Sequence, residues 1–305
     1  MYSPAPPVRT APTAASINTV AYHVEMTTPD APADRYTHGH HQSVLASHKA
    51  RTAENSAAYL VPYLKPGLRV LDVGCGPGTI STDFARMVSP GEVVALDRSQ
   101  EIVAQAAELA FQEGIHNLTA TVGDVYHLDY PSDSFDVTHA HQVLQHLSDP
   151  VAALREMARV TKPGGTIAVR DADYAAMAWY PADERLDTWQ SVYHAVAHAN
   201  DAEPDAARHL LSWARQAGLN NIRPLASVWC WADDATRQWW GGLWAERVQH
   251  SALAEQALEG GFASSATLAE IADAFREWSS NPDGWFTVLN GELLATPAID
   301  QDDAG

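Results

Sequence analysis

Residues 70–80 decide the fold and read "VLDVGCGPGTI", from Val70 to Ile80. A run of apolar residues typical of a buried strand stops at Gly74, and two more glycines follow within the next four positions. Glycine has no Cβ, so the backbone of this loop can turn sharply and approach a ligand closely. A helical pattern begins next, and the free N–H groups of its first turn would face that ligand. The segment therefore predicts a strand, a ligand-binding loop and a helix.

Short segments rich in β-forming residues alternate with helical patterns between Leu68 and Ile222. Such alternation is typical of repeated strand–helix units and of a mostly parallel sheet with helices on both faces. The strand candidates are "LRVLDV" (68–73), "EVVALD" (92–97), "LTATVG" (118–123), "FDVTHA" (135–140), "TIAVRD" (166–171) and a sixth at 222–229, which follows a helix expected over 205–217. We therefore expect an α/β protein with a doubly wound sheet.

Composition narrows the class of protein. The 305 residues are 46% hydrophobic, which is enough for a folded globular protein. Nineteen Lys and Arg stand against 38 Asp and Glu, so the net charge of −19 repels nucleic acid and anionic membranes, and neither is expected as a partner. The two cysteines form no disulfide framework, no apolar run approaches about 18 residues, and no secretion signal pattern is seen, so we expect a soluble cytoplasmic protein.

The two ends of the chain differ in composition from the part between them. Residues 1–34 are rich in Ala, Pro and Thr without periodicity, so we expect this segment to be disordered or loosely attached. Met26 is itself a plausible translation start. The rest divides into one domain over 35–298, with insertions at 172–204 and 232–281, and an acidic tail at 299–305.

Acidic residues at two strand ends indicate which ligand the loop binds. Asp97 ends the second strand about 20 residues after the loop, where a carboxylate can accept both ribose hydroxyls. That pair alone would also suit a dinucleotide oxidoreductase. The glycines, however, give G-x-G-x-G rather than G-x-G-x-x-G, and Asp124 after the third strand can accept a proton from an adenine amine, with Val125 beside the ring. This set favours a nucleoside without a second nucleotide.

Four ordered segments carry a family resemblance over residues 36–171: "VLDVGCGPG", "VVALDRS", "GDVYHLDYPSDSFDVTHAHQVLQHLSDP" and "LREMARVTKPGGTIAVRD". The sequence resembles class I S-adenosylmethionine-dependent methyltransferases, particularly small-molecule enzymes similar to those of ubiquinone and menaquinone biosynthesis. The resemblance implies a Rossmann-like, seven-stranded sheet ending in an antiparallel strand, with a cofactor-binding core at 67–171 and N-terminal cap helices at 36–62. "WFTVLNGELLAT" (285–296) is the candidate for that last strand, and its Asn-Gly pair suits a hairpin turn or a bulge.

The resemblance also implies roles for individual residues around bound S-adenosylmethionine. It places the glycine loop, with Gly74, Cys75 and Gly76, beside the methionine half of the cofactor. Asp97 would bind the ribose hydroxyls with Arg98 beside the adenine, and the base would lie among Gly123, Asp124 and Val125. His141 and Gln142 would lie near the sulfonium. We expect Cys75 to be a small loop residue rather than a nucleophile, and Asp72 to accept from loop amides or from the cofactor's amino group.

Catalytic residues can be few, because the cofactor carries its own leaving group and a base is needed only when the acceptor must lose a proton. The family lays N-terminal helices over the cofactor, so Tyr36 and His41 in "RYTHGHHQSVLASHKARTAENSA" are candidates for contacting cofactor or substrate. Among the histidines of "THAHQVLQH", His141 is preferred. No metal is expected, because no Cys, Asp or Glu completes a familiar ligand spacing around "HGHH".

The substrate has weaker signals. Seven tryptophans fall in or beside the two insertions, where the family covers the acceptor. An aromatic cover favours a small aromatic or heteroaromatic metabolite, and the pattern also resembles bacterial enzymes that methylate indole carbon in specialised metabolism. The alternative is a protein of the same fold that binds the cofactor without methyl transfer, either as a binding module or for a rearrangement or decarboxylation. The oligomeric state has no signal in the sequence.

Overall fold

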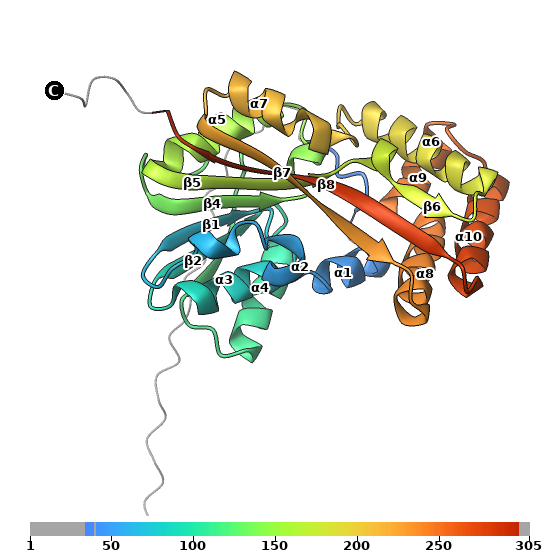
Figure 1. The fold of residues 1–305 in the computed structure, drawn as a ribbon, viewed down its shortest axis with the longest axis horizontal. Coiled ribbons are helices and arrows are strands. Elements are labelled where there is room, and N and C mark those ends of the chain that lie inside the picture. Colours follow the sequence, from blue (N-terminus) through green and yellow to red (C-terminus); the bar gives the residue numbers. More distant parts are fainter. Residues whose placement is uncertain (1–33, 40, 299–305) are drawn as a thin grey trace, which may run out of the picture. The chain divides into compact units, whose positions relative to one another are not determined.

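A computed structural model of the chain describes residues 34–39 and 41–298. The expectations for residues 1–33 and for the acidic tail at 299–305 lie outside this range. A single mixed sheet runs through the described part, with helices on both of its faces (Figure 1). The strands are β1 (Arg69–Val73), β2 (Glu92–Asp97), β3 (Leu118–Val122), β4 (Phe135–His141), β5 (Thr161–Ala172), β6 (Ala178–Tyr180), β7 (Asn220–Trp231) and β8 (Trp285–Thr296).

The order of the strands confirms the doubly wound α/β fold. The sheet runs β3-β2-β1-β4-β5-β8-β6, and β7 pairs with the other edge of β8. Strands β1 to β5 are parallel, whereas β8 is antiparallel to its neighbours β5 and β7, as expected for the last strand. Within residues 34–39 and 41–298 the sheet has eight strands rather than seven, because the short β6 follows β5 along the same edge of β8.

The Asn-Gly pair in β8 forms neither a turn nor a bulge, contrary to the expectation from sequence. Asn290 and Gly291 lie inside one continuous strand and pair with β5 on one side and with β7 on the other. A Cβ at Gly291 would lie 2.7 Å from the carbonyl oxygen of Ala207. The glycine therefore permits the backbone at Ala207 to pack closely on the strand.

Helices surround the sheet. They are α1 (Gln42–Lys49), α2 (Ala53–Ser56), α3 (Thr79–Val88), α4 (Gln100–Gln112), α5 (Pro150–Val160), α6 (Glu184–Ala199), α7 (Leu210–Gln216), α8 (Asp234–His250), α9 (Ala252–Glu259) and α10 (Ser265–Ser280). Two helices begin at side-chain caps: the Ser99 side chain accepts from the amide of Ile102, and Asp149 caps a helix with Pro150 at its first position. The helix predicted over 205–217 is a short 3₁₀ helix, Ala206–His209, followed by α7.

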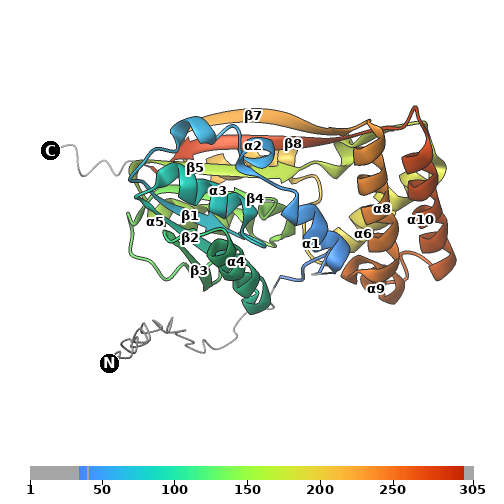
Figure 2. The same ribbon diagram turned by 90° about the horizontal axis from the view of Figure 1, so that it is seen from below.

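Four of these helices, α6, α8, α9 and α10, form a cap beyond one end of the sheet. Figure 2 shows α6, α8, α9 and α10 together, with α1 between them and the strands β1 to β4. The tryptophans expected to line a substrate pocket mostly form the core of this cap, because Trp189 and Trp244 are fully buried and pack edge to face, 4.6 Å between ring centroids. Trp244 also stacks on Phe275 of α10 at 5.8 Å. These rings therefore hold the cap together, and Trp229 and Trp239 are among those only partly buried.

Candidate functional site

The glycine loop between β1 and α3 has the backbone conformation that the sequence predicted. Gly74, Gly76 and Gly78 have φ values of 65°, 56° and 85°, which favour glycine. A Cβ at Gly74 would lie 2.3 Å from a methyl carbon of Val143, so this glycine is also required by packing. A Cβ at Gly76 would meet its nearest atom, Nδ1 of His48, at 3.8 Å. The side of Gly76 where a Cβ would stand is therefore open.

Asp97 at the end of β2 lies directly against this loop. Its carboxylate accepts from the amide of Gly76 at 3.2 Å and from the amide of Ser99 at 3.0 Å, and the side chain is partly exposed. The backbone oxygen of Asp97 also accepts from the amide of Gly123 at 3.1 Å. The structure thus brings together the loop, the predicted ribose carboxylate and the start of the predicted adenine segment.

The other residues predicted around the nucleoside lie at the ends of β2 and β3. Asp124 is exposed and accepts from the amide of Tyr126 at 2.9 Å, whereas Val125 is buried. The guanidinium of Arg98 donates to the backbone oxygen of Asp34 at 2.5 Å. Their contacts with a nucleoside remain predictions.

Cys75 has the structural role expected of it. Its amide donates to the backbone oxygen of Leu96, and its thiol is buried. Burial raises the pKa of that thiol well above its usual value, which disfavours a nucleophilic thiolate.

Asp72 of β1 has different partners from those expected. Its carboxylate accepts from the hydroxyl of Ser81 at 2.5 Å and lies 2.7 Å from Nδ1 of His139, and all three residues are buried. Contrary to one expectation from sequence, Asp72 accepts from no loop amide in the described part of the chain, and its contact with the cofactor's amino group stays a prediction. The reason is that β1 and β4 are neighbours with Asp72 opposite His139, a pairing that the sequence does not reveal.

His141 is the last residue of β4, and its imidazole ring is buried. Only 5% of it is exposed, and neither ring nitrogen has a hydrogen-bond partner among the described residues. Burial, with added repulsion from Arg51 and Arg170, holds the pKa of His141 well below its usual value, so the ring is neutral at pH 7. The edge of the ring faces Trp229 of β7, at 5.8 Å between centroids.

Gln142 follows His141 in a conformation that is uncommon for residues other than glycine, with φ of 54°. Its side-chain oxygen accepts from the guanidinium of Arg51, and its amide donates to Asn290 of β8 at 3.4 Å. Residues held in this conformation occur often at functional sites. Both residues predicted near the sulfonium therefore lie where polar groups gather at the end of β4.

Tyr36 packs at the same end of the sheet. Its ring lies edge to face on His146, 4.7 Å between centroids, and its hydroxyl is 3.5 Å from Nε2 of His48. Burial raises the pKa of Tyr36 to about 12. Burial likewise lowers the pKa of His146 to about 3, so both side chains are uncharged at pH 7.

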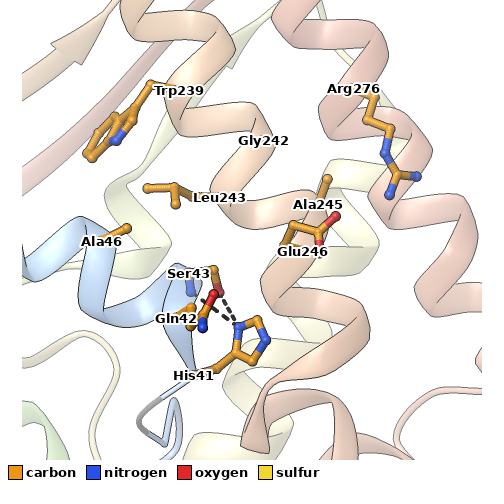
Figure 3. Close-up of a pocket in the computed structure, with 10 residues that line it drawn as sticks. All are labelled: His41, Gln42, Ser43, Ala46, Trp239, Gly242, Leu243, Ala245, Glu246 and Arg276. Carbon is orange, nitrogen blue, oxygen red and sulfur yellow. Dashed lines mark hydrogen bonds between the residues drawn. The ribbon is translucent and has the colours of Figure 1, made fainter.

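His41 is placed elsewhere. Its Nδ1 accepts from the amide of Ser43 at the start of α1, and no contact among the described residues joins it to Tyr36 or His141. It lines a pocket of about 490 Å³ between α1, α8 and α10 (Figure 3). Trp239 and Glu246 of α8 and Arg276 of α10 lie around this pocket. The structure therefore brings Tyr36 and His141 to the ends of the strands but does not bring His41 there.

Three more polar residues beside these are candidates from the sequence: His38 for closing the site, and Asp171 and Tyr174, which follow the fifth strand, for binding substrate. Nε2 of His38 lies 2.9 Å from the hydroxyl of Tyr193 and 3.2 Å from that of Tyr174, whose rings stack on each other at 3.8 Å. Asp171 at the end of β5 accepts from the amide of Gln145, and its second oxygen has no partner among the described residues. Burial raises the pKa of Asp171 to about 8. The sequence signal for these candidates is their position, before the core or just after a strand, whereas the contact of His38 with Tyr193 has no signal in the sequence.

These residues fit S-adenosylmethionine. Asp97 offers a partly exposed carboxylate beside the bare backbone of Gly76, as a ribose next to a methionine chain requires. His141 adds two buried ring nitrogens without partners among the described residues, at the end of β4, which pairs with β1. Among the described residues, no group of three or more His, Cys, Asp or Glu could hold a metal ion, and no helix is long and apolar enough to cross a membrane.

Known proteins are similar to this chain over most of its length. A family model described as a methyltransferase domain matches residues 64–234. An uncharacterized methyltransferase of Schizosaccharomyces pombe is 37% identical over 269 residues, covering 85% of this chain and 95% of that protein. The probable methyltransferase ltbC of Aspergillus luteorubrus is 29% identical over 281 residues, covering 86% and 97%. The crystal structure of YcgJ from Bacillus subtilis shares the fold, with a TM-score of 0.54 at 19% identity over 81% of this chain and 100% of that one.

The family model covers more than half of the chain, and the yeast relative matches nearly from end to end. Both agree with the family expected from the glycine loop and from the acidic strand ends. The chain therefore belongs to the class I methyltransferases that use S-adenosylmethionine as their cofactor.

Proposed function

We propose that this enzyme transfers the methyl group of S-adenosylmethionine to a small aromatic or heteroaromatic metabolite, in specialised metabolism, at the ends of β4 and β5. When bound, the cofactor supplies an electrophilic methyl group and its own leaving group. The chain then has to hold an electron-rich atom in line and keep out water. The observation that carries the proposal is His141, a buried neutral imidazole with two unpartnered nitrogens beside an aromatic ring.

Trp229 supports an aromatic acceptor. Its indole N–H donates to the backbone oxygen of Asn55 at 2.8 Å, and the guanidinium of Arg170 lies 4.3 Å from its ring centroid, so the ring is fixed in place. It is only partly buried. Flat rings pack well on a fixed aromatic side chain, and methylation of an indole carbon is one reaction of this kind.

His141 and Tyr36 are the proposed acceptor contacts. A neutral imidazole can accept a hydrogen bond from the N–H or O–H of an acceptor while that atom or its ring attacks the methyl group. Tyr36 keeps its proton up to about pH 12 and so can act as a hydrogen-bond donor. His41 is engaged at the start of α1 and is not included in this proposal.

Methyl-labelled cofactor incubated with a panel of indoles, phenols and amines tests the function directly. Transfer of label to at least one ring-containing acceptor is the expected result, together with tight binding of S-adenosylhomocysteine by calorimetry. Binding of S-adenosylhomocysteine without transfer to any acceptor would favour a rearrangement or decarboxylation enzyme, or a binding module. In that case the assignment of the cofactor would stand and that of methyl transfer would fall.

A further inference from the structure

The pocket between α1, α8 and α10 shares no lining residue with the site at the ends of β4 and β5 (Figure 3). Its volume of about 490 Å³ falls in the range of small-molecule sites, about 300–1,000 Å³. Helices of the cap and of the N-terminal segment form its walls. A molecule held there would be a second ligand, distinct from the cofactor and the acceptor.

One face of α8 forms a wall of this pocket. Trp239, Gly242, Leu243 and Glu246 line it, at the spacing i, i+3, i+4 and i+7 that places residues on one side of a helix. With a rise of about 1.5 Å per residue, Trp239 and Glu246 stand about 10 Å apart along the helix axis. Ala46 of α1 lines the other side of the pocket. The wall therefore carries an aromatic ring at one end and a carboxylate at the other.

Gly242 is the member of this wall that the packing of the protein does not require. Glycine inside a helix is less favourable than alanine. A Cβ at the preceding Gly241 would lie 2.7 Å from the backbone oxygen of Phe275, so that glycine is needed for the contact with α10. A Cβ at Gly242 would meet no atom within 4 Å, and the residue is exposed. A ligand that lies directly on the bare helix gives this glycine a reason.

Glu246 supplies the charge that the pocket offers to a ligand. Its one ion pair among the described residues is with Nε2 of His250, at 3.9 Å, and more than half of its side chain is exposed. The guanidinium of Arg276 is engaged instead, because it donates to the carboxylate of Asp273 at 2.9 Å and to the side-chain oxygen of Gln249 at 3.2 Å. The pocket therefore presents a carboxylate rather than a guanidinium.

We propose that this pocket binds a small, flat aromatic amine. The ring packs on the bare helix at Gly242, beside the side chains of Trp239 and Leu243, and the ammonium group pairs with Glu246. A cationic ligand also suits a chain with a net charge of −19. The proposal goes beyond the proposed function and does not depend on methyl transfer.

Calorimetry with three probes tests the charge of the ligand. Tryptamine is the amine, 3-ethylindole is the same molecule without the amino group, and indole-3-acetate carries the opposite charge. We expect tryptamine to bind most tightly and indole-3-acetate most weakly. Glu246→Gln should weaken tryptamine binding roughly threefold, as an exposed ion pair allows, and leave 3-ethylindole binding unchanged.

A second pair of variants tests the place of the ring. Gly242→Leu puts a side chain where the ring would lie, so it should weaken both tryptamine and 3-ethylindole by about tenfold or more. Ala266→Leu is the matched control, because it adds the same side chain at an exposed position of α10 outside the pocket, and both probes should bind it normally. Melting curves show that each variant is folded.

Three outcomes overturn the proposal. Tryptamine binding that neither Gly242→Leu nor Glu246→Gln weakens, in folded variants, places the probe at another site. A preference for indole-3-acetate over tryptamine rules out the amine, and no binding of tryptamine to the natural protein rules out the site. None of these results bears on methyl transfer, which the labelled cofactor tests separately.

Discussion

Asp97 shows how a single side chain can serve both the fold and a ligand. Its two oxygens accept from the amides of Gly76 and Ser99, so it fastens the glycine loop to β2 and begins α4. The side chain nevertheless stays partly exposed at the end of the strand. Each carboxylate oxygen can accept more than one hydrogen bond, so a carboxylate that accepts from backbone amides can also accept from ribose hydroxyls.

Replacing Asp97 by alanine should weaken binding of S-adenosylhomocysteine by on the order of 2 kcal/mol or more, about 30-fold in Kd, because two charge-assisted hydrogen bonds are lost. Calorimetry on the purified variant measures this. Asp97→Asn, which keeps one oxygen acceptor, should lose less. Glu92→Gln, at the exposed far end of the same strand, is the control that should bind normally. Undiminished affinity in a folded Asp97→Ala protein would refute the ribose assignment.

Asp171 makes stability depend on pH. Burial raises its pKa from 3.8 to about 8, so between these values the folded protein keeps a proton that the unfolded chain has lost. The folded state is therefore favoured at the acidic end of this window, and its stability declines as pH rises toward about 8. In urea titrations from pH 5 to 9, the unfolding free energy of the natural protein minus that of Asp171→Asn should fall with pH and then level off. Parallel pH profiles would contradict the assignment.

Two adjacent glycines in α8, Gly241 and Gly242, have different surroundings. A Cβ at Gly241 would lie 2.7 Å from the backbone oxygen of Phe275 and 2.6 Å from Cβ of Ser279, both in α10. A Cβ at Gly242 would meet no atom within 4 Å. The close contact of α8 with α10 therefore requires the first glycine but not the second.

The pair gives opposite expectations for one substitution. Gly241→Ala should destabilise the protein by about 1–3 kcal/mol, because the clash is with backbone and forces the helices apart. Gly242→Ala should stabilise it by about 0.5–1 kcal/mol, because alanine favours the helix and finds open space. Urea unfolding of the two variants measures both values. Equal effects from the two substitutions would mean that α8 and α10 do not pack in this way.

Elements defined by local chemistry could be predicted from the sequence, whereas those defined by distant neighbours could not. The strand that ends before Gly74 depends on adjacent residues, and it was predicted correctly. The prediction of a hairpin turn or a bulge at the Asn-Gly pair of β8 was wrong, because the close approach of Ala207 is a tertiary contact. For the same reason, Asp72 was not matched with His139, and the tryptophans of the cap were expected around a ligand rather than in a core.

At the scale of the whole described chain, α1 connects the two parts that enclose the site. On one side, Arg247 of α8 in the cap donates to the backbone and the hydroxyl of two serines in α1. On the other, His48 at the end of α1 accepts from Thr79 beside the glycine loop, and Arg51 reaches Gln142 after β4. The sequence indicated that the N-terminal segment covers the cofactor, but it gave no sign of Arg51 or of the link to the cap.

This connection predicts a response of the chain to its cofactor product. The N-terminal segment is expected to cover the cofactor, so a ligand against the glycine loop should reduce local opening of α1, α2 and the linker between them. Opening would break contacts with the ligand as well as with Thr79 and Gln142. Hydrogen–deuterium exchange with and without saturating S-adenosylhomocysteine measures this. Amides of residues 45–56 should exchange more slowly with ligand, along with those of the loop at 74–79. Amides of α7, on the other side of the sheet, provide the control and should be unchanged. Protection of the loop without protection of 45–56 would show that the segment does not close on the ligand.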